Sequence, residues 1–155
     1  MREERVTFEL GLLDLCERTG LPVFGICGGF QTMNVYRGGS LIQDLPTLAK
    51  GPVVHQGADH PVRLSLPWPE EGGEEKSQVL VNSFHHQGVD RLGKNLDILA
   101  LSPDDRLVEG VFDRSHPFFV GVQWHPERMD PTNALSRTLR SAFLNACKEA
   151  RAARP

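Results

Sequence analysis

A short apolar run that ends in a cysteine between glycines most constrains how this chain can fold. The run, residues 23–26, has the length and residue types of a strand buried on both faces. Cys27, Gly28 and Gly29 follow, and residues 30–36 carry no helix breaker. A nucleophilic residue beside glycines, between a strand and a helix, is typical of a nucleophile elbow, a turn too tight for larger side chains. Backbone N–H groups there favour a thiolate and a developing oxyanion, although a buried structural cysteine fits the same stretch.

The composition indicates one globular domain over residues 1–155, with 39% hydrophobic and 24% charged residues. A net charge of −3 without a Lys/Arg cluster argues against nucleic acid or an acidic membrane as a partner. The apolar runs are too short to cross a bilayer, and the charged residues 1–5 do not resemble a signal peptide. Three widely spaced cysteines favour reduced thiols, so we expect a cytoplasmic protein.

A helix is expected before the cysteine strand, because apolar residues recur at helical spacing over residues 3–18 and Gly20 ends the pattern. Helix, strand and helix in tight succession are the unit of an α/β fold with a parallel sheet. Such folds normally begin with a strand. We therefore expect the opening strands of the fold to be missing upstream of the first helix.

Further strands and a final helix are expected after the elbow helix. Alternating or continuous apolar residues predict strands at 62–66, 79–81, 98–101, 107–112 and 118–122. Residues 40–50 are interpreted as a loop or short helix, and the acidic residues 70–77 as a solvated connection. Asp130 and Pro131 are expected to begin a helix over 132–150 that buries Leu135, Leu139, Phe143, Ala146 and Cys147.

Two polar residues after the last predicted strand could complete a catalytic site. His125 and Glu127 alternate across Pro126, so an extended segment would point both side chains into the same space. A thiol becomes a useful nucleophile when a histidine accepts its proton and a third group holds that histidine. A triad of Cys27, His125 and Glu127 requires only that the two strands be neighbours. Taken singly, His125 could be a loop residue and Glu127 a surface carboxylate.

These motifs resemble those of the class I glutamine amidotransferase-like enzymes, most closely the γ-glutamyl-γ-aminobutyrate hydrolase branch. The resemblance covers the chain from the first helix onward. It implies an α/β, three-layer, flavodoxin-like, mostly parallel sheet with helices on both faces, here lacking its first strands. It is carried by Gly25-Ile26-Cys27-Gly28-Gly29-Phe30-Gln31, by Val81-Asn82-Ser83-Phe84-His85-His86-Gln87-Gly88-Val89-Asp90 and by Gln123-Trp124-His125-Pro126-Glu127.

The resemblance also implies an activity. Cys27 would attack a γ-glutamyl amide and form a γ-glutamyl thioester, with water as the final acceptor. His125 would act as base and acid, Glu127 would orient His125, and the Gly28 N–H matches one oxyanion donor. No cofactor is implied.

The substrate contacts implied by the resemblance are Gln31 and the loop 83–87. Gln31 lies one helical turn after Cys27, and Ser83, Phe84, His85, His86 and Gln87 match the loop that receives the α-amino and α-carboxylate groups. Neutral amides, hydroxyls and backbone groups can bind a zwitterion without a large buried charge. From spacing alone, Gln31 could be a polar residue at a helix start and the loop merely solvated.

The histidines do not predict a metal site. His55 and His60 are five apart, His85 and His86 are adjacent, and no cysteine pair has ligand spacing. We therefore expect no metal.

Departures from the family pattern leave alternatives open. The family commonly has a bulky or basic residue after the cysteine, where this chain has Gly28. The family's first part, which supplies opening strands and a second oxyanion donor, is absent. The chain could thus be a catalytically impaired fragment or a non-catalytic binding subunit, or the glutaminase subunit of an amidotransferase. We expect it to form homo-oligomers or to associate with the missing amino-terminal segment.

Overall fold

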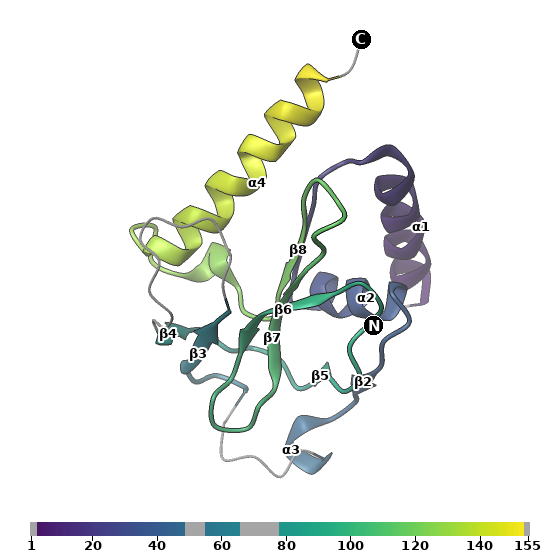
Figure 1. Ribbon diagram of the computed structural model, residues 1–155. Coiled ribbons are helices and arrows are strands. Elements are labelled where there is room, and N and C mark those ends of the chain that lie inside the picture. Colours follow the sequence, from purple (N-terminus) through teal and green to yellow (C-terminus); the bar gives the residue numbers. More distant parts are fainter. Residues whose placement is uncertain (1–2, 49–54, 66–77, 154–155) are drawn as a thin grey trace.

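The computed structural model describes residues 3–48, 55–65 and 78–153 (Figure 1). The elements in chain order are α1 (Glu3–Thr19), β1 (Val23–Ile26), α2 (Gly28–Tyr36), β2 (Leu41–Ile42), α3 (Leu45–Leu48), β3 (His60–Leu64), β4 (Gln78–Val81), β5 (Gly88–Val89), β6 (Asp97–Leu101), β7 (Val108–Phe112), β8 (Phe119–Val122), the 3-10 helix η1 (Pro126–Arg128) and α4 (Ala134–Ala152). No helix in these ranges is long and apolar enough to cross a membrane.

A six-stranded sheet in the order β1-β8-β7-β6-β3-β4 forms the centre of the fold. The α/β class expected from the sequence is confirmed, but the strand directions differ from the mostly parallel expectation. Only β1 and β8 run parallel, while the other neighbouring pairs are antiparallel. The connections from β6 to β7 and from β7 to β8 are too short to hold a crossover helix, so these strands pair as hairpins. The sheet is therefore mixed.

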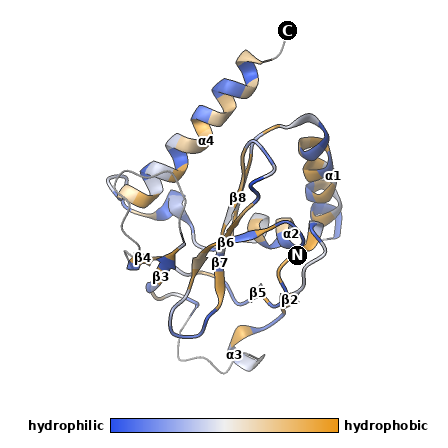
Figure 2. Cartoon of the chain, in the orientation of Figure 1, coloured by the Kyte–Doolittle hydropathy of each residue, from blue (hydrophilic) through white to orange (hydrophobic). Residues whose placement is uncertain are grey.

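Helices cover both faces of this sheet, as expected (Figure 1). Successive side chains of β8 point to opposite sides, so Phe119 packs in one cluster with Leu13 of α1 and Phe30 of α2, and Val120 packs in another with Leu139 of α4. Figure 2 shows the hydrophobic strands β7 and β8 between these helices. The result is a three-layer arrangement.

Strand β1 lies at an edge of the sheet. Its pairing with β8 occupies one side, and no described strand pairs with the other. Gly25 is buried, whereas Val23, Phe24 and Ile26 are only half-buried. The expectation of a strand buried on both faces is therefore wrong for the described residues, because none of their strands covers the second side of β1.

Most element positions agree with the sequence expectations. The helices expected at 3–18 and after the cysteine are present as α1 and α2, and the strands expected at 23–26, 79–81, 98–101, 107–112 and 118–122 as β1, β4, β6, β7 and β8. The strand expected at 62–66 is shifted, since β3 begins at His60. Residues 40–48 hold β2 and α3, while residue 66 and the connection 70–77 lie outside the described residues.

The start of the last helix differs from the expectation. Asn133 is the N-cap of α4, and its Oδ1 accepts a hydrogen bond of 3.0 Å from the Ser136 backbone N. Asp130 instead closes the preceding turn, accepting from the Thr132 backbone N at 2.7 Å. Asp and Asn are both favourable N-cap residues, and Asn133, which directly precedes α4, is the one that caps it. Of the α4 side chains expected to be buried, only Leu139 is fully buried.

Candidate active site

Cys27 occupies the turn between β1 and α2 in a backbone conformation that non-glycine residues rarely adopt. Its φ is 50° and its ψ is −105°. Such strain is common where a nucleophile is presented at a strand-to-helix turn. A side chain at Gly25 would collide with Met33 Sδ and lie 2.9 Å from the Phe30 backbone N, whereas Gly29 has open space around it. The crowding expected of an elbow therefore holds at Gly25 but not at Gly29.

The parallel pairing of β1 with β8 brings the cysteine next to the segment that carries His125. Ile26 lies opposite Val122, and the Cys27 backbone N donates to Val122 O at 2.9 Å. The two strands are thus neighbours, which is the arrangement that a triad requires. Because β1 and β8 are parallel, their carboxyl ends lie at the same end of the sheet.

His125 and Glu127 form a close pair, with 2.6 Å between Nδ1 and Oε1. This bond makes Nδ1 the donor in the neutral ring, so Nε2 carries the lone pair that could accept a proton. The pair does not form by extended alternation, because Pro126 and Glu127 lie in η1. A tight turn brings the carboxylate back to the ring instead.

Asn82 holds the backbone of His125 from the end of β4. Its Oδ1 accepts from His125 N at 2.8 Å and its Nδ2 donates to His125 O at 2.9 Å. The Phe84 ring stands edge-on to the His125 ring, with the centroids 6.0 Å apart. No role for Asn82 was predicted from the sequence, although it lies in one of the matched motifs and follows a predicted strand directly.

Gln123 is the side chain that contacts the sulfur. Its Nε2 donates to Cys27 Sγ at 3.6 Å, and its Oε1 accepts from Gln31 Nε2 at 3.0 Å. Gln31 also donates to Gln87 O at 2.9 Å, so one buried glutamine links the elbow helix to the loop 83–87. Among the described residues, no hydrogen bond joins Cys27 to His125. No role for Gln123 was predicted from the sequence, although it opens the matched motif that carries His125 and Glu127.

Burial raises the pKa of the Cys27 thiol, and the negative charge of Glu127 raises it further. The Gly28 backbone N–H and the Gln123 amide lower the pKa but do not reverse the direction. The Gly28 N–H therefore favours the thiolate, as expected for an elbow, but burial of Cys27 outweighs this effect on its pKa. Cys27 rests as a neutral thiol at neutral pH, so a base must take its proton during the reaction.

The residues of the predicted substrate loop point alternately to opposite sides. Phe84 and His86 are exposed, whereas Ser83 and His85 are buried. Ser83 Oγ donates to His55 O at 2.7 Å, and His85 turns inward to a group of buried ligand-type side chains. The structure thus brings Phe84 to His125, and it directs the Ser83 and His85 side chains elsewhere. Their substrate contacts stay predictions, as does that of Gln87, whose Nε2 donates to Gln43 Oε1 at 2.7 Å.

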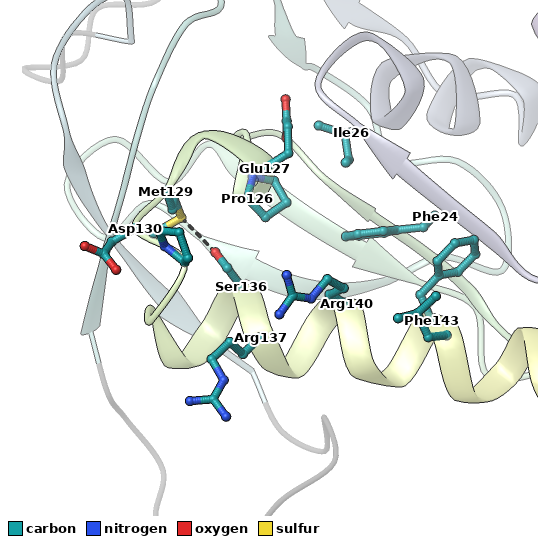
Figure 3. Close-up of a pocket in the computed structure, with 12 residues that line it drawn as sticks. Phe24, Ile26, Pro126, Glu127, Met129, Asp130, Ser136, Arg137, Arg140 and Phe143 are labelled. Carbon is teal, nitrogen blue, oxygen red and sulfur yellow. Dashed lines mark hydrogen bonds between the residues drawn. The ribbon is translucent and has the colours of Figure 1, made fainter.

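Two pockets flank the candidate active site. The first has a volume of about 410 Å³ and lies between β1, η1 and α4, where Phe24 faces Phe143 and Arg140 (Figure 3). The second has a volume of about 450 Å³ and is lined in part by Asn82 and Phe84. Cys27 lines neither pocket. The first pocket reaches the site at Glu127. The second reaches it at Asn82, which holds the backbone of His125.

Comparison with solved structures places the chain in a known α/β fold class. The structure of a putative GMP synthase subunit from Thermoplasma acidophilum matches with a TM-score of 0.69 over 92% of this chain and 66% of that chain, at 22% identity. At this identity the match concerns the fold alone. The match therefore supports the three-layer α/β fold described above.

The family model described as peptidase C26 matches residues 1–127, and the chain belongs to this family. The γ-glutamyl-γ-aminobutyrate hydrolase PuuD of Escherichia coli K12 is 38% identical over 160 residues, covering 93% of this chain and 61% of the relative. Protein NtpR of Enterococcus hirae is 38% identical over 150 residues, covering 91% and 62%. These matches confirm the resemblance identified from the motifs. The chain spans about three fifths of the length of these relatives.

Proposed function

We propose that this chain carries the nucleophile, base and orienting carboxylate of a cysteine-dependent hydrolase of γ-glutamyl amides. The observation that carries the proposal is the strained Cys27 turn at the carboxyl end of β1, beside the β8 end that leads to the His125–Glu127 pair. Membership of the C26 family and similarity to a γ-glutamyl-γ-aminobutyrate hydrolase support the substrate class.

The proposed first step forms a thioester. His125 Nε2 takes the proton from Cys27 Sγ, the sulfur attacks the γ-carbonyl carbon, and the resulting oxyanion receives the Gly28 N–H. When the C–N bond breaks, His125 gives its proton to the leaving amine. The amine departs, and a γ-glutamyl thioester remains on Cys27.

The proposed second step returns the enzyme to its starting state. His125 takes a proton from water, the hydroxide attacks the thioester carbonyl, and the C–S bond breaks. The His125 imidazolium returns its proton to the leaving sulfur, so the products are the free Cys27 thiol and the γ-carboxyl group of glutamate, which loses its proton to water. Because Glu127 accepts from Nδ1, it stabilises the imidazolium that exists in both steps.

A second candidate is a catalytically impaired form of the same fold. It is favoured by the unpaired side of β1 within the described residues and by a single assigned oxyanion donor, Gly28. Under this hypothesis the chain binds a γ-glutamyl compound without turning it over, or needs an additional segment to do so.

The experiment that tests the proposal is incubation with a panel of γ-glutamyl amides, followed by mass spectrometry of the intact chain and its peptides. We expect release of one amine and a trapped glutamyl adduct on Cys27. A Cys147→Ser variant is the matched control, because this half-exposed thiol lies on α4 away from the elbow. An adduct on another cysteine, or turnover without Cys27, would refute the assignment, and binding without an adduct would favour the impaired form.

A further inference from the structure

Four buried ligand-type side chains converge in a place that the proposed reaction does not use. They are His55, His60 at the start of β3, His85 after β4 and Glu109 on β7, and their ligand atoms all lie within 4.8 Å of one another. Glu109 is 0% exposed and the three histidines are 4–6% exposed. Segments far apart in the sequence thus bring three imidazoles and a carboxylate together in the interior.

The distances within this cluster match metal coordination better than hydrogen bonding. Glu109 Oε1 lies 3.5 Å from His55 Nδ1, 3.4 Å from His60 Nε2 and 3.6 Å from His85 Nε2. Charge-assisted hydrogen bonds are shorter, at about 2.7–2.9 Å. Ligands placed about 2.0–2.1 Å from a tetrahedral zinc ion stand about 3.3–3.4 Å from each other. One contact, of 3.0 Å between His55 Nδ1 and His60 Nε2, also fits a hydrogen bond.

Several polar atoms of the cluster lack hydrogen-bond partners in the part of the chain that the structure describes. They are both carboxylate oxygens of Glu109, Nε2 of His85 and Nδ1 of His60. A buried carboxylate without a partner is strongly unfavourable. A cation among these atoms would remove the penalty for Glu109 and His85.

The surrounding hydrogen bonds direct imidazole lone pairs toward Glu109. His85 Nδ1 donates to Gln87 O at 2.9 Å, and His55 Nε2 donates to Asp105 Oδ2 at 2.7 Å. The opposite ring nitrogens then carry lone pairs that face another acceptor, the Glu109 carboxylate. Metal-binding histidines characteristically donate their second N–H to a carboxylate or carbonyl in this way. The charges of Glu109 and Asp105 would offset those of a divalent cation.

The protonation states agree with this arrangement. Burial lowers the pKa of His85 to about 3 and also lowers the pKa of His60, so both rings are neutral, the form that binds metal. Burial raises the pKa of Glu109 well above its usual range, so without a cation this carboxyl holds a proton that a metal would displace.

We propose that His55, His60, His85 and Glu109 form a structural zinc site that fastens the loop 82–87 to the sheet. Three imidazoles and one carboxylate in a closed, buried set are ligands that suit zinc, with no position left for a reacting water. Because the same loop carries Asn82 and Phe84, the site would stabilise the segment that holds His125. The sequence spacing did not predict this site, since its ligands meet only through the sheet.

The test is the zinc content of the purified 155-residue chain, produced without a polyhistidine tag in zinc-supplemented medium. We expect about one zinc per chain by mass spectrometry of the metal, a ratio that does not depend on association. Removal by EDTA should lower the Tm by at least about 5 °C, and zinc in hundredfold excess over its Kd should restore it. Replacement by Co²⁺ should give the visible bands of a four-coordinate ion.

Variants identify the ligands. Glu109→Gln and His85→Gln should each lose most of the zinc, while His86→Gln, a change at the exposed neighbour, should keep it. Cys27, His125 and Glu127 are themselves possible zinc ligands, so Cys27→Ser tests whether the metal lies there instead. This variant should keep the zinc. The Co²⁺ spectrum should accordingly lack a thiolate charge-transfer band.

The proposal is overturned if the parent holds only traces of zinc and shows no Co²⁺ bands. In that case the cluster is a network around a protonated Glu109. It is equally overturned if Glu109→Gln and His85→Gln keep the metal, or if Cys27→Ser loses it. Should either cluster variant fail to fold, the Co²⁺ spectrum and the EDTA melting of the parent chain still decide.

Discussion

Replacing each member of the His125–Glu127 pair should reduce turnover by very different amounts. His125→Ala removes the only base expected to take the Cys27 proton, and general base catalysis contributes about 10²–10⁴-fold. Glu127→Gln keeps an acceptor for His125 Nδ1 and removes only a charge. The Glu127 side chain is 50% exposed, so solvent screening limits the value of that charge to about 1 kcal/mol. This corresponds to a loss of about fivefold.

The assay is kcat/KM for amine release from the best γ-glutamyl amide, in the most active form of the protein. That form is either the chain alone or the chain supplied with an upstream segment. The rate of Cys27 alkylation at neutral pH gives a second measure. It should fall in His125→Ala but not in Glu127→Gln, because loss of the Glu127 charge lowers the Cys27 pKa. Thermal melting of both variants controls for loss of fold. Equal losses of turnover in the two variants would refute the assigned roles.

Three further predictions follow from the same geometry. Cys27→Ser should leave less than a few per cent of the activity with an unchanged Tm, and greater residual turnover would exclude Cys27 as the nucleophile. Iodoacetamide should label Cys27 faster as the pH rises through and beyond the ordinary thiol range of about 8.5, since burial raises the Cys27 pKa; a rate that is already constant near pH 7 would contradict this. The chain alone should oligomerise and be nearly inactive, because no described strand pairs with the second side of β1 and α1 exposes Phe8, Leu12 and Leu15; a chain that is monomeric by light scattering and active in amine release would refute it.

Local sequence pattern predicted the elements that carry the proposed chemistry. The apolar run before Cys27 and the glycines around it indicate a strand, a tight turn and a helix, each of which depends on neighbouring residues. The placement of β1 beside β8 was required by the triad hypothesis and is present. These features were accessible because strand ends and turns have short-range signals.

Features that depend on tertiary pairing were not predicted. The expected parallel directions failed where short connections turn β6, β7 and β8 into hairpins. Burial of β1 depends on a neighbour that the pattern of residues 23–26 does not reveal. The inward turn of His85 toward Glu109 follows from alternation along the loop, and only the sheet determines which residues lie on the inner side.

The two-way clamp between Asn82 and His125 has a consequence for how substrate preference can change in this family member. Since Asn82 binds both the N–H and the carbonyl of His125, a shift of the loop that carries Phe84 also shifts His125. In the proposed reaction, loop substitutions that enlarge the site for a bulkier amine would therefore also disturb proton transfer, unless the backbone at Asn82 stays fixed. Exchange of exposed side chains such as Phe84 and His86 leaves that backbone in place. Insertions or deletions within residues 82–87 would alter selectivity and rate together.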